Sequence, residues 1–179
     1  MRSSAPQAVK PVVSIFTGEA PLFKEALSGL IKRLGPVDIL SPILPFDHTD
    51  YYEKEFGKGL KRRLASFERL IRPDELADVK IFTNGLERTF FAGDGKRRVN
   101  IDPGCMALEK FVLASCKGFS HRIYIGRGVY AELTLMYEGS AFVSLPWTYP
   151  DYKDERMQAV LRLIRKRHAF NIRRAEVKK

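Results

Sequence analysis

Two hydrophobic spacings alternate along the first hundred residues, and their order constrains the fold more than any other feature of the chain. Short apolar runs rich in β-branched residues are typical of strands, whereas apolar residues every three or four positions are typical of helices. The helical spacing occurs over 23–34 and again over 76–90. The strand-like runs occupy 12–16, 37–44, 60–71 and 99–102. The order strand, helix, strand, strand, helix, strand predicts an α+β fold with a ferredoxin-like split βαβ core.

Two of these assignments depend on proline. The run 60–71 also fits a helix, but Pro73 is typical of a new helix start, which favours a strand. The run 37–44 is interrupted at Pro42, so we expect that strand at an edge of the sheet.

The second half is expected to extend this core with a helix and a β-meander, in a mixed and mostly antiparallel sheet. We expect Pro103-Gly104 to stop a strand at Asp102, and a helix to follow over 106–115. A hairpin around Gly126 and Gly128 joins 121–125 to 129–137, and 141–145 supplies a further strand. The aromatic and proline-rich segment 146–152 is expected to lack regular structure, and the polar stretch FDHTDYYEKEFGKG is expected to form a loop or a ragged hairpin.

The domain boundaries follow from composition. With 179 residues, the chain is long enough for one domain with a sizeable core. We expect a flexible N-terminus over 1–10, a single α+β domain over 11–152, and a basic C-terminal helix with its tail over 153–179.

Charge and cysteine content indicate which partners and compartment to expect. The formal net charge is +10 and the pI about 9.7, which favours anionic partners, although a solvated basic surface explains it equally well. The two cysteines form no CxxC pair, so a zinc ribbon or a disulfide framework is not expected. The N-terminus lacks the apolar run of a signal peptide and no stretch reaches membrane-span length, so we expect a cytoplasmic protein without membrane contact.

Several easily recognised enzyme motifs are missing. The chain has no GxxxxGK[ST] phosphate loop, no dinucleotide-binding glycine pattern, no HExxH and no GxSxG. The sequence therefore names no reaction, and it predicts neither an enzyme class nor a cofactor.

Polar residues alternate with apolar ones in two of the predicted strands. Side chains on a strand point to opposite faces in turn, so each polar set should share one face. The first set is Arg98, Asn100 and Asp102, and the second is Tyr130, Glu132 and Thr134. If both strands lie in one sheet, these side chains indicate a polar ligand site.

Three residues are candidates for acid or base catalysis: Asp102, His121 and Glu132. Carboxylates act as acid and base when their surroundings separate their pKa values, and histidine titrates near neutral pH. Each has a structural alternative. Asp102 could cap a helix, His121 could be half-buried and bonded to backbone, and Glu132 could pair with an arginine on a neighbouring strand.

Basic residues near this face are candidates for holding an anion. The guanidinium group of arginine can donate two parallel hydrogen bonds to phosphate or carboxylate oxygens. Together with a lysine, such residues bind anions, so Arg98, Lys110 and Arg122 would bind the charged group of a ligand. Aromatic residues of 147–152 could stack on a ring or pin that segment to the sheet.

A second reading is a nucleic-acid-binding module without catalysis. Basic residues next to aromatic residues are typical of proteins that bind single-stranded nucleic acid, through phosphate contacts and base stacking. The basic C-terminal helix over 156–179 adds to the positive charge. The basic cluster is Lys58, Lys61, Arg62 and Arg63, just after Tyr51 and Tyr52. Asp47, His48 and Asp50 are residue types that can ligate a metal ion, but their spacing matches no known metal-binding motif, and no metal site is predicted.

In combination, several segments resemble an uncharacterised bacterial family, domain of unknown function 4416. They read FDHTDYYEKEFGKGLKRRLASFERLI, ELADVKIFTN, RRVNIDPG, FSHRIYIGRGVYAELTL and WTYPDY, within roughly residues 10–155. The resemblance implies no established activity. The positions to test that match its blocks are Asp102, His121, Arg122, Tyr124, Glu132 and Tyr149.

These observations lead to one hypothesis and one alternative. We expect a protein that binds a phosphorylated small molecule or nucleotide on a basic polar sheet face, and the sequence leaves open whether it also acts on this ligand. The alternative is an RNA-binding module that uses the basic clusters.

Overall fold

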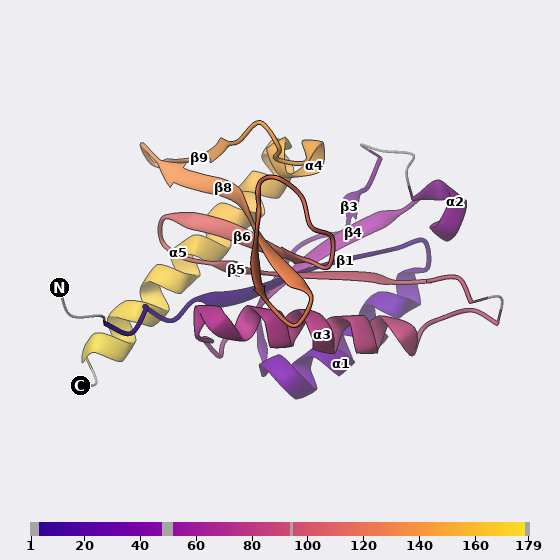
Figure 1. The fold of residues 1–179 in the computed structure, drawn as a ribbon, viewed down its shortest axis with the longest axis horizontal. Helices are drawn as coiled ribbons and strands as arrows, with labels where there is room; N and C mark the ends of the chain where they lie inside the picture. The colour runs from indigo at the N-terminus through magenta and orange to yellow at the C-terminus, as the bar shows by residue number, and fades with distance from the viewer. Residues whose placement is uncertain (1–3, 48–51, 94, 178–179) are drawn as a thin grey trace.

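The computed structural model describes residues 4–47, 52–93 and 95–177, and it has one antiparallel sheet with helices on both faces (Figure 1). The expected loop residues His48, Asp50 and Tyr51 lie outside the described ranges. The strands are β1 (Lys10–Thr17), β2 (Val37–Leu40), β3 (Leu44–Pro45), β4 (Lys61–Phe67), β5 (Asn100–Met106), β6 (Lys110–Ser115), β7 (Arg122–Gly126), β8 (Val129–Glu138) and β9 (Ala141–Ser144). The helices are α1 (Ala20–Leu34), α2 (Glu53–Phe56), α3 (Leu76–Arg88), α4 (Pro150–Lys153) and α5 (Glu155–Val177), with a 3₁₀ turn over Pro73–Glu75.

The strand order is β2-β4-β1-β5-β6-β8-β7, and all pairings among the described residues are antiparallel. β3 pairs with β4, and β9 pairs with β8. The α+β class is confirmed, and β2 lies at the end of the sheet as its prolines predicted. The ferredoxin-like description of β1, β2, β4 and β5 stays a prediction.

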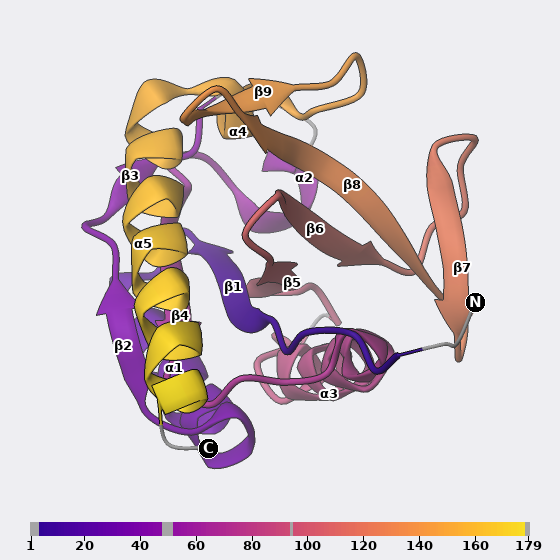
Figure 2. The same ribbon diagram turned by 90° about the vertical axis from the view of Figure 1, so that its left-hand side faces the viewer.

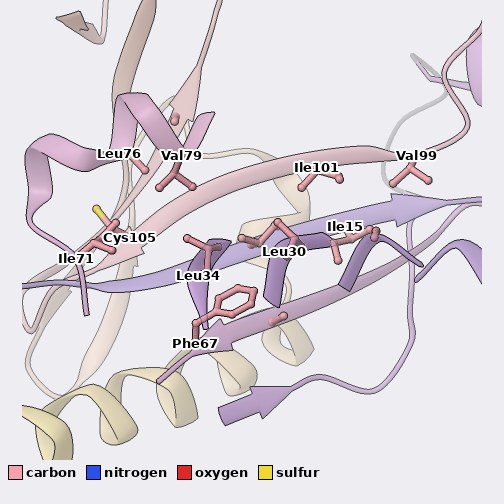
Figure 3. Packing of buried hydrophobic residues seen from close by; sticks show 14 of the residues in the cluster. Ile15, Leu30, Leu34, Phe67, Ile71, Leu76, Val79, Val99, Ile101 and Cys105 are labelled. Carbon is pink, nitrogen blue, oxygen red and sulfur yellow. The ribbon is translucent and has the colours of Figure 1, made fainter. Parts of the chain in front are cut away.

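One face of the sheet is covered by α1 and α3, which lie side by side (Figure 1). The apolar stripes of these helices point at the same face of β1 and β5, where Leu30, Val79, Ile15 and Ile101 are buried together (Figure 3). Gly35 ends α1 with a φ of +87°, a conformation that glycine adopts without strain. The helical spacing read from the sequence is therefore confirmed in both helices.

The opposite face is partly covered by α5, which lies across it (Figure 2). Its Leu161 and Ile164 pack against Leu64, Phe111 and Leu135 of three different strands. Because α5 and the strands share this cluster, the C-terminal helix contributes to the hydrophobic core. Within the described ranges, no helix is long and apolar enough to cross a membrane.

The prediction of a helix over 106–115 is wrong. The strand β5 continues through Pro103-Gly104 to Met106, and 110–115 forms β6, which pairs with it. A short apolar run fits either period, so spacing alone did not separate a helix from a strand here. Smaller differences concern 53–56, which form the helix α2 instead of a loop or hairpin, and 150–153, which form α4 instead of irregular structure. The helix α5 begins at Glu155.

Other assignments from the sequence are confirmed. The run 60–71 contains the strand β4, a helix follows Pro73, and β7 and β8 form the predicted hairpin around 126–128. The strand β9 matches the expected 141–145 closely.

Gly104 is required where β5 meets β6. A Cβ atom at this position would lie 2.5 Å from the carbonyl oxygen of Val112 and 3.0 Å from Leu113 Cδ2. We expect Gly104→Ala to lower the free energy of unfolding by about 1–3 kcal/mol, because the backbones must move apart. Urea denaturation measures this loss.

Gly85 supplies the matched control, because it lies within α3 and a Cβ there meets nothing within 4 Å. Gly85→Ala should raise the free energy of unfolding by about 0.5–1 kcal/mol, since alanine favours helix. Equal effects of the two substitutions would contradict the close approach at Gly104.

Candidate functional site

The site begins where β5 and β6 diverge. The two strands pair only over 104–106 and 111–113, so the first half of β5 has a strand partner on the β1 side alone. Pro103 suits this gap, because it has no N–H to leave unpaired. The helix α3 replaces the missing strand: Glu87 Oε1 accepts a hydrogen bond from Ile101 N–H at 2.6 Å, and Lys80 Nζ donates to Ile101 O at 3.3 Å.

A cavity of about 700 Å³ opens at this divergence, a size typical of small-molecule sites. Its charged lining is balanced, with five carboxylates and five cations among the described residues. They are Glu55, Glu87, Asp102, Glu132 and Asp151, with Arg62, Lys80, Arg97, Lys117 and Arg122. The rest of the lining is Phe46, Tyr52, Tyr149 and Tyr152, with Asn84, Asn100, Leu113, Ala114, Ser115, Cys116 and Pro150.

The strand register explains why residues from distant segments share this wall. Asp102 is opposite Ser14, which is opposite Leu64, and Glu132 is opposite Leu113. Partners in an antiparallel register point to the same face, and this is the face that α5 covers farther along. Burial raises the pKa of Tyr52 and of Tyr152 to about 12, so both phenols stay protonated in the wall.

Asp102 is held by two neighbours in the wall. Lys80 Nζ lies 3.1 Å from its Oδ1, and Asn100 Nδ2 donates to its Oδ2 at 2.5 Å. Burial lowers the pKa of Lys80, but the carboxylates of Asp102 and Glu87 more than offset this, and the net shift is upward. The ammonium group therefore stays charged. The helix-cap alternative for Asp102 is wrong, because the residue lies within β5 and the next element in the chain is the strand β6.

Arg97 joins the short helix α2 to this cluster. Its Nε and Nη2 donate to the two carboxylate oxygens of Glu55 at 2.6 and 2.7 Å, and its Nη1 donates to Asn100 Oδ1 at 3.0 Å. The guanidinium also lies 5.1 Å from the ring centroid of Phe56. The pKa of Glu55 is lowered mainly by the hydrogen bond from Arg97, so this pair is ionised.

Glu132 is the most buried acid of the wall, with 1% of its surface exposed. Its Oε2 accepts a hydrogen bond from Arg122 Nε at 2.8 Å and lies 3.0 Å from His121 Nε2. Its Oε1 has no hydrogen-bond partner among the described residues. The cross-strand alternative is confirmed, since Arg122 is opposite Glu132 in the register of β7 and β8.

Arg122 and His121, the two partners of Glu132, also contact residues of the segments around Lys117 and Tyr149. Arg122 also donates to Tyr149 Oη at 2.6 Å and to Lys117 O at 2.9 Å. The His121 ring stacks on Trp147, with centroids 5.0 Å apart and planes 9° apart. The backbone-bonded alternative for His121 therefore does not hold, because its partner in the structure is a carboxylate. Trp147 Nε1 donates to Leu133 O at 2.8 Å, so this segment is pinned to the sheet.

Arg62 lies in the wall instead of on a basic surface. It forms an ion pair with Asp151, and its guanidinium lies 4.1 Å from the Phe46 ring centroid. Only 5% of its surface is exposed, and burial lowers its pKa. Arg63 donates to Ser41 O, whereas Lys61 is exposed. The basic cluster of Lys58, Lys61, Arg62 and Arg63 predicted from the sequence is therefore divided between the interior and the surface.

The structure brings together five of the eleven predicted site residues and places a sixth beside them. Asn100, Asp102, Arg122, Glu132 and Tyr149 line the cavity, and His121 bonds to Glu132.

The other five residues lie elsewhere. Arg98 pairs with Glu19 at the surface, and Lys110 pairs with Glu109. Tyr124 is exposed and contacts the ring of Tyr130. Thr134 is buried and donates to Glu132 O at 3.2 Å.

A β-bulge explains why the polar set of β8 does not share one face. The register places Leu135 opposite Phe111 but Leu133 opposite Val112, so Thr134 is the extra residue. One extra residue reverses the alternation, which puts Leu135 on the same face as Glu132. Alternation in the sequence cannot reveal such a residue.

Several wall residues were not predicted from the sequence. Lys80, Asn84 and Glu87 come from α3, at spacings of four and three residues that place them on one side of the helix. This polar stripe was a possible signal, but a stripe beside an apolar face is usually solvated. Among the described residues, no group of three or more histidine, cysteine or acidic side chains is placed to hold a metal ion.

Comparison with known proteins gives one match. A family model described as a domain of unknown function (DUF4416) matches residues 7–168. No curated protein and no solved structure matches the chain.

Proposed function

Because the chain belongs to the DUF4416 family, whose description states no activity, we propose its function from the cavity: it binds a phosphorylated small molecule, with nucleotides as the preferred class. One observation carries the proposal. Glu132 is buried in the cavity wall, yet one of its carboxylate oxygens has no hydrogen-bond partner among the described residues. A buried acceptor without a partner is costly, so a ligand that donates a hydrogen bond there gains affinity.

The charge balance supports an uncharged ligand group inside the cavity. Arg62, Lys80, Arg97 and Arg122 are each paired with a carboxylate of the wall. An anion placed among these pairs would meet the carboxylates as well as the cations. Hydroxyl and amino groups, such as those of a ribose and a base, suit this lining better.

The phosphate of such a ligand is assigned to the exposed part of the lining. Lys117 is both exposed and part of the cavity lining. The net charge of +10 also attracts anions to the protein before they bind. In this proposal, Glu132 accepts a ligand hydroxyl, and it is the base for any reaction at that hydroxyl, with His121 at its other oxygen.

Glu132→Gln tests the proposal. Arg122 and His121 require an acceptor, so the glutamine oxygen should face them and its NH₂ group should face the ligand. This change replaces an acceptor by a donor, and we expect nucleotide affinity to fall about 10- to 100-fold. A thermal-shift screen of ribonucleotides, nucleosides and sugar phosphates, followed by calorimetric titration, measures the effect.

Glu138→Gln is the matched control, because it makes the same change on the same strand at an exposed residue outside the cavity. It should bind like the wild type. The proposal is wrong if none of these compounds stabilises the wild type, or if both variants bind equally well.

An RNA-binding role has its own supporting observation. Phe170 is 48% exposed on α5, and the guanidinium groups of Arg167 and Arg174 lie 5.6 and 5.7 Å from its ring centroid. Deleting α5 would not test this role, since the helix belongs to the core. RNA binding through this face would weaken steeply with salt and would be unaffected by Glu132→Gln.

A further inference from the structure

We propose that Cys116 is a modification site of the cavity, which reacts with low-molecular-weight disulfides of the glutathione type to form a mixed disulfide that blocks ligand entry. The blocking effect rests on the proposed function, whereas the modification itself does not. Cys116 directly follows β6, is exposed and lines the cavity.

The second cysteine provides a contrast within the same chain. Cys105 is buried in the core beneath α1 and α3, and burial raises the pKa of its thiol to about 12. The thiolate is the reacting form of cysteine, so Cys105 is inert in the folded protein.

The surroundings of Cys116 favour reaction at its sulfur. Asn84 Nδ2 donates a hydrogen bond to Sγ at 3.2 Å, and a donor at this position stabilises negative charge on the sulfur. Lys117 follows Cys116 in the chain and is exposed as part of the same lining. Its ammonium group attracts the carboxylates of a glutathione-type reagent.

The cavity itself also suits a bound group. Glu132, whose buried Oε1 has no hydrogen-bond partner among the described residues, is one of the residues that line it. The volume of about 700 Å³ has room for a group of tripeptide size, so an adduct on Cys116 has space within the cavity.

The reaction is a thiol–disulfide exchange. The Cys116 thiol loses its proton to water, and the thiolate attacks one sulfur of the disulfide RSSR. A new S–S bond forms as the old one breaks, and the leaving thiolate takes the electron pair and a proton. The products are the mixed disulfide and RSH, so the reagent is reduced as Cys116 is oxidised. An excess of thiol reverses the reaction.

Intact-mass measurement after incubation of the folded protein with glutathione disulfide tests the site. We expect one adduct per chain, lost in Cys116→Ser and retained in Cys105→Ser. Asn84→Ala should slow the reaction about fivefold, the effect of one modest hydrogen bond. Alanine favours helix, so α3 should keep its structure in this variant. Modification of both cysteines, or a rate that does not change in Asn84→Ala, would overturn the site.

Ligand binding then tests the blocking effect. A nucleotide that stabilises the protein should protect Cys116, and the adduct should abolish the nucleotide-induced thermal shift until dithiothreitol removes it. A bound nucleotide that gives no protection, with an adduct that leaves binding unchanged, would overturn the blocking effect. If no nucleotide binds while Cys116 reacts selectively, the proposed ligand fails and the modification site stands.

Discussion

Replacing Arg122 by alanine is expected to lower the free energy of unfolding by about 3–5 kcal/mol. The variant leaves the carboxylate of Glu132, which is 1% exposed, with His121 as its remaining side-chain partner among the described residues. It also removes the hydrogen bonds to Tyr149 Oη and Lys117 O. A buried charge that has lost its partner is costly, because the low-dielectric interior does not replace its solvation. Urea denaturation, read as a lower midpoint with an unchanged slope, measures the loss.

Two further variants show whether the loss comes from the unpaired carboxylate. Arg98→Ala removes an arginine of the same sequence region, but one that pairs with Glu19 at the surface, so its effect should be far smaller. Adding Glu132→Gln to Arg122→Ala should restore part of the stability, because it removes the uncompensated charge. The explanation fails if Arg122→Ala and Arg98→Ala are equally stable.

This prediction changes how Arg122 can be used experimentally. The sequence indicated Arg122 as a residue that binds the charged group of a ligand. Its contacts to Glu132, Tyr149 and the backbone of Lys117 make it part of the framework of the wall. Glu132→Gln, which retains an acceptor for Arg122, is therefore the cleaner test of ligand binding.

The protein should lose stability between about pH 6.5 and pH 4 because of His168. This residue belongs to α5 and is 1% exposed, and burial, with Lys10 as a lesser cause, lowers its pKa from 6.5 to about 4. In this window the unfolded chain binds a proton that the folded protein excludes. The contribution of the neutral imidazole is therefore complete above pH 6.5 and is lost as the pH falls, by about 3 kcal/mol in total.

Comparing the wild type with His168→Leu isolates this contribution. Nδ1 of His168 has no hydrogen-bond partner among the described residues, so an apolar side chain of similar size fits the site. We expect the free energy of unfolding, measured by urea denaturation between pH 7.5 and 4.5, to fall less steeply with decreasing pH in the variant than in the wild type. Subtracting the pH dependence of the variant from that of the wild type cancels the contributions of Glu109 and of the other titrating groups, and leaves the contribution of His168. Parallel curves would show that His168 titrates normally in the folded protein.

The local structure of this chain was largely predictable because it depends on residues close in sequence. The apolar spacing of α1 and α3 and the glycines between β7 and β8 act over a few residues. The helix predicted over 106–115 failed because a short apolar run carries no decisive period. What makes that segment a strand is its pairing with β5, where Gly104 permits close approach.

The site depended much more on long-range structure. The strand pattern correctly indicated a polar surface that includes Asp102 and Glu132, and the cross-strand pairing of Glu132 with an arginine was anticipated. The pattern did not indicate Lys80 and Glu87, which reach the cavity only because β6 diverges from β5 and leaves an edge for α3 to cover.

By itself, the sequence determined the class of fold, most of its helices and strands, and the family, since periodicity and motif order are properties of the chain. The tertiary structure alone decided which charges meet. Lys80 pairs with Asp102 and Arg62 pairs with Asp151 across many intervening residues, through the order of the strands and the point at which two of them separate. The sequence gives the type of each side chain, but the partner of a side chain and its exposure to water depend on helices and strands from distant parts of the chain that pack around it.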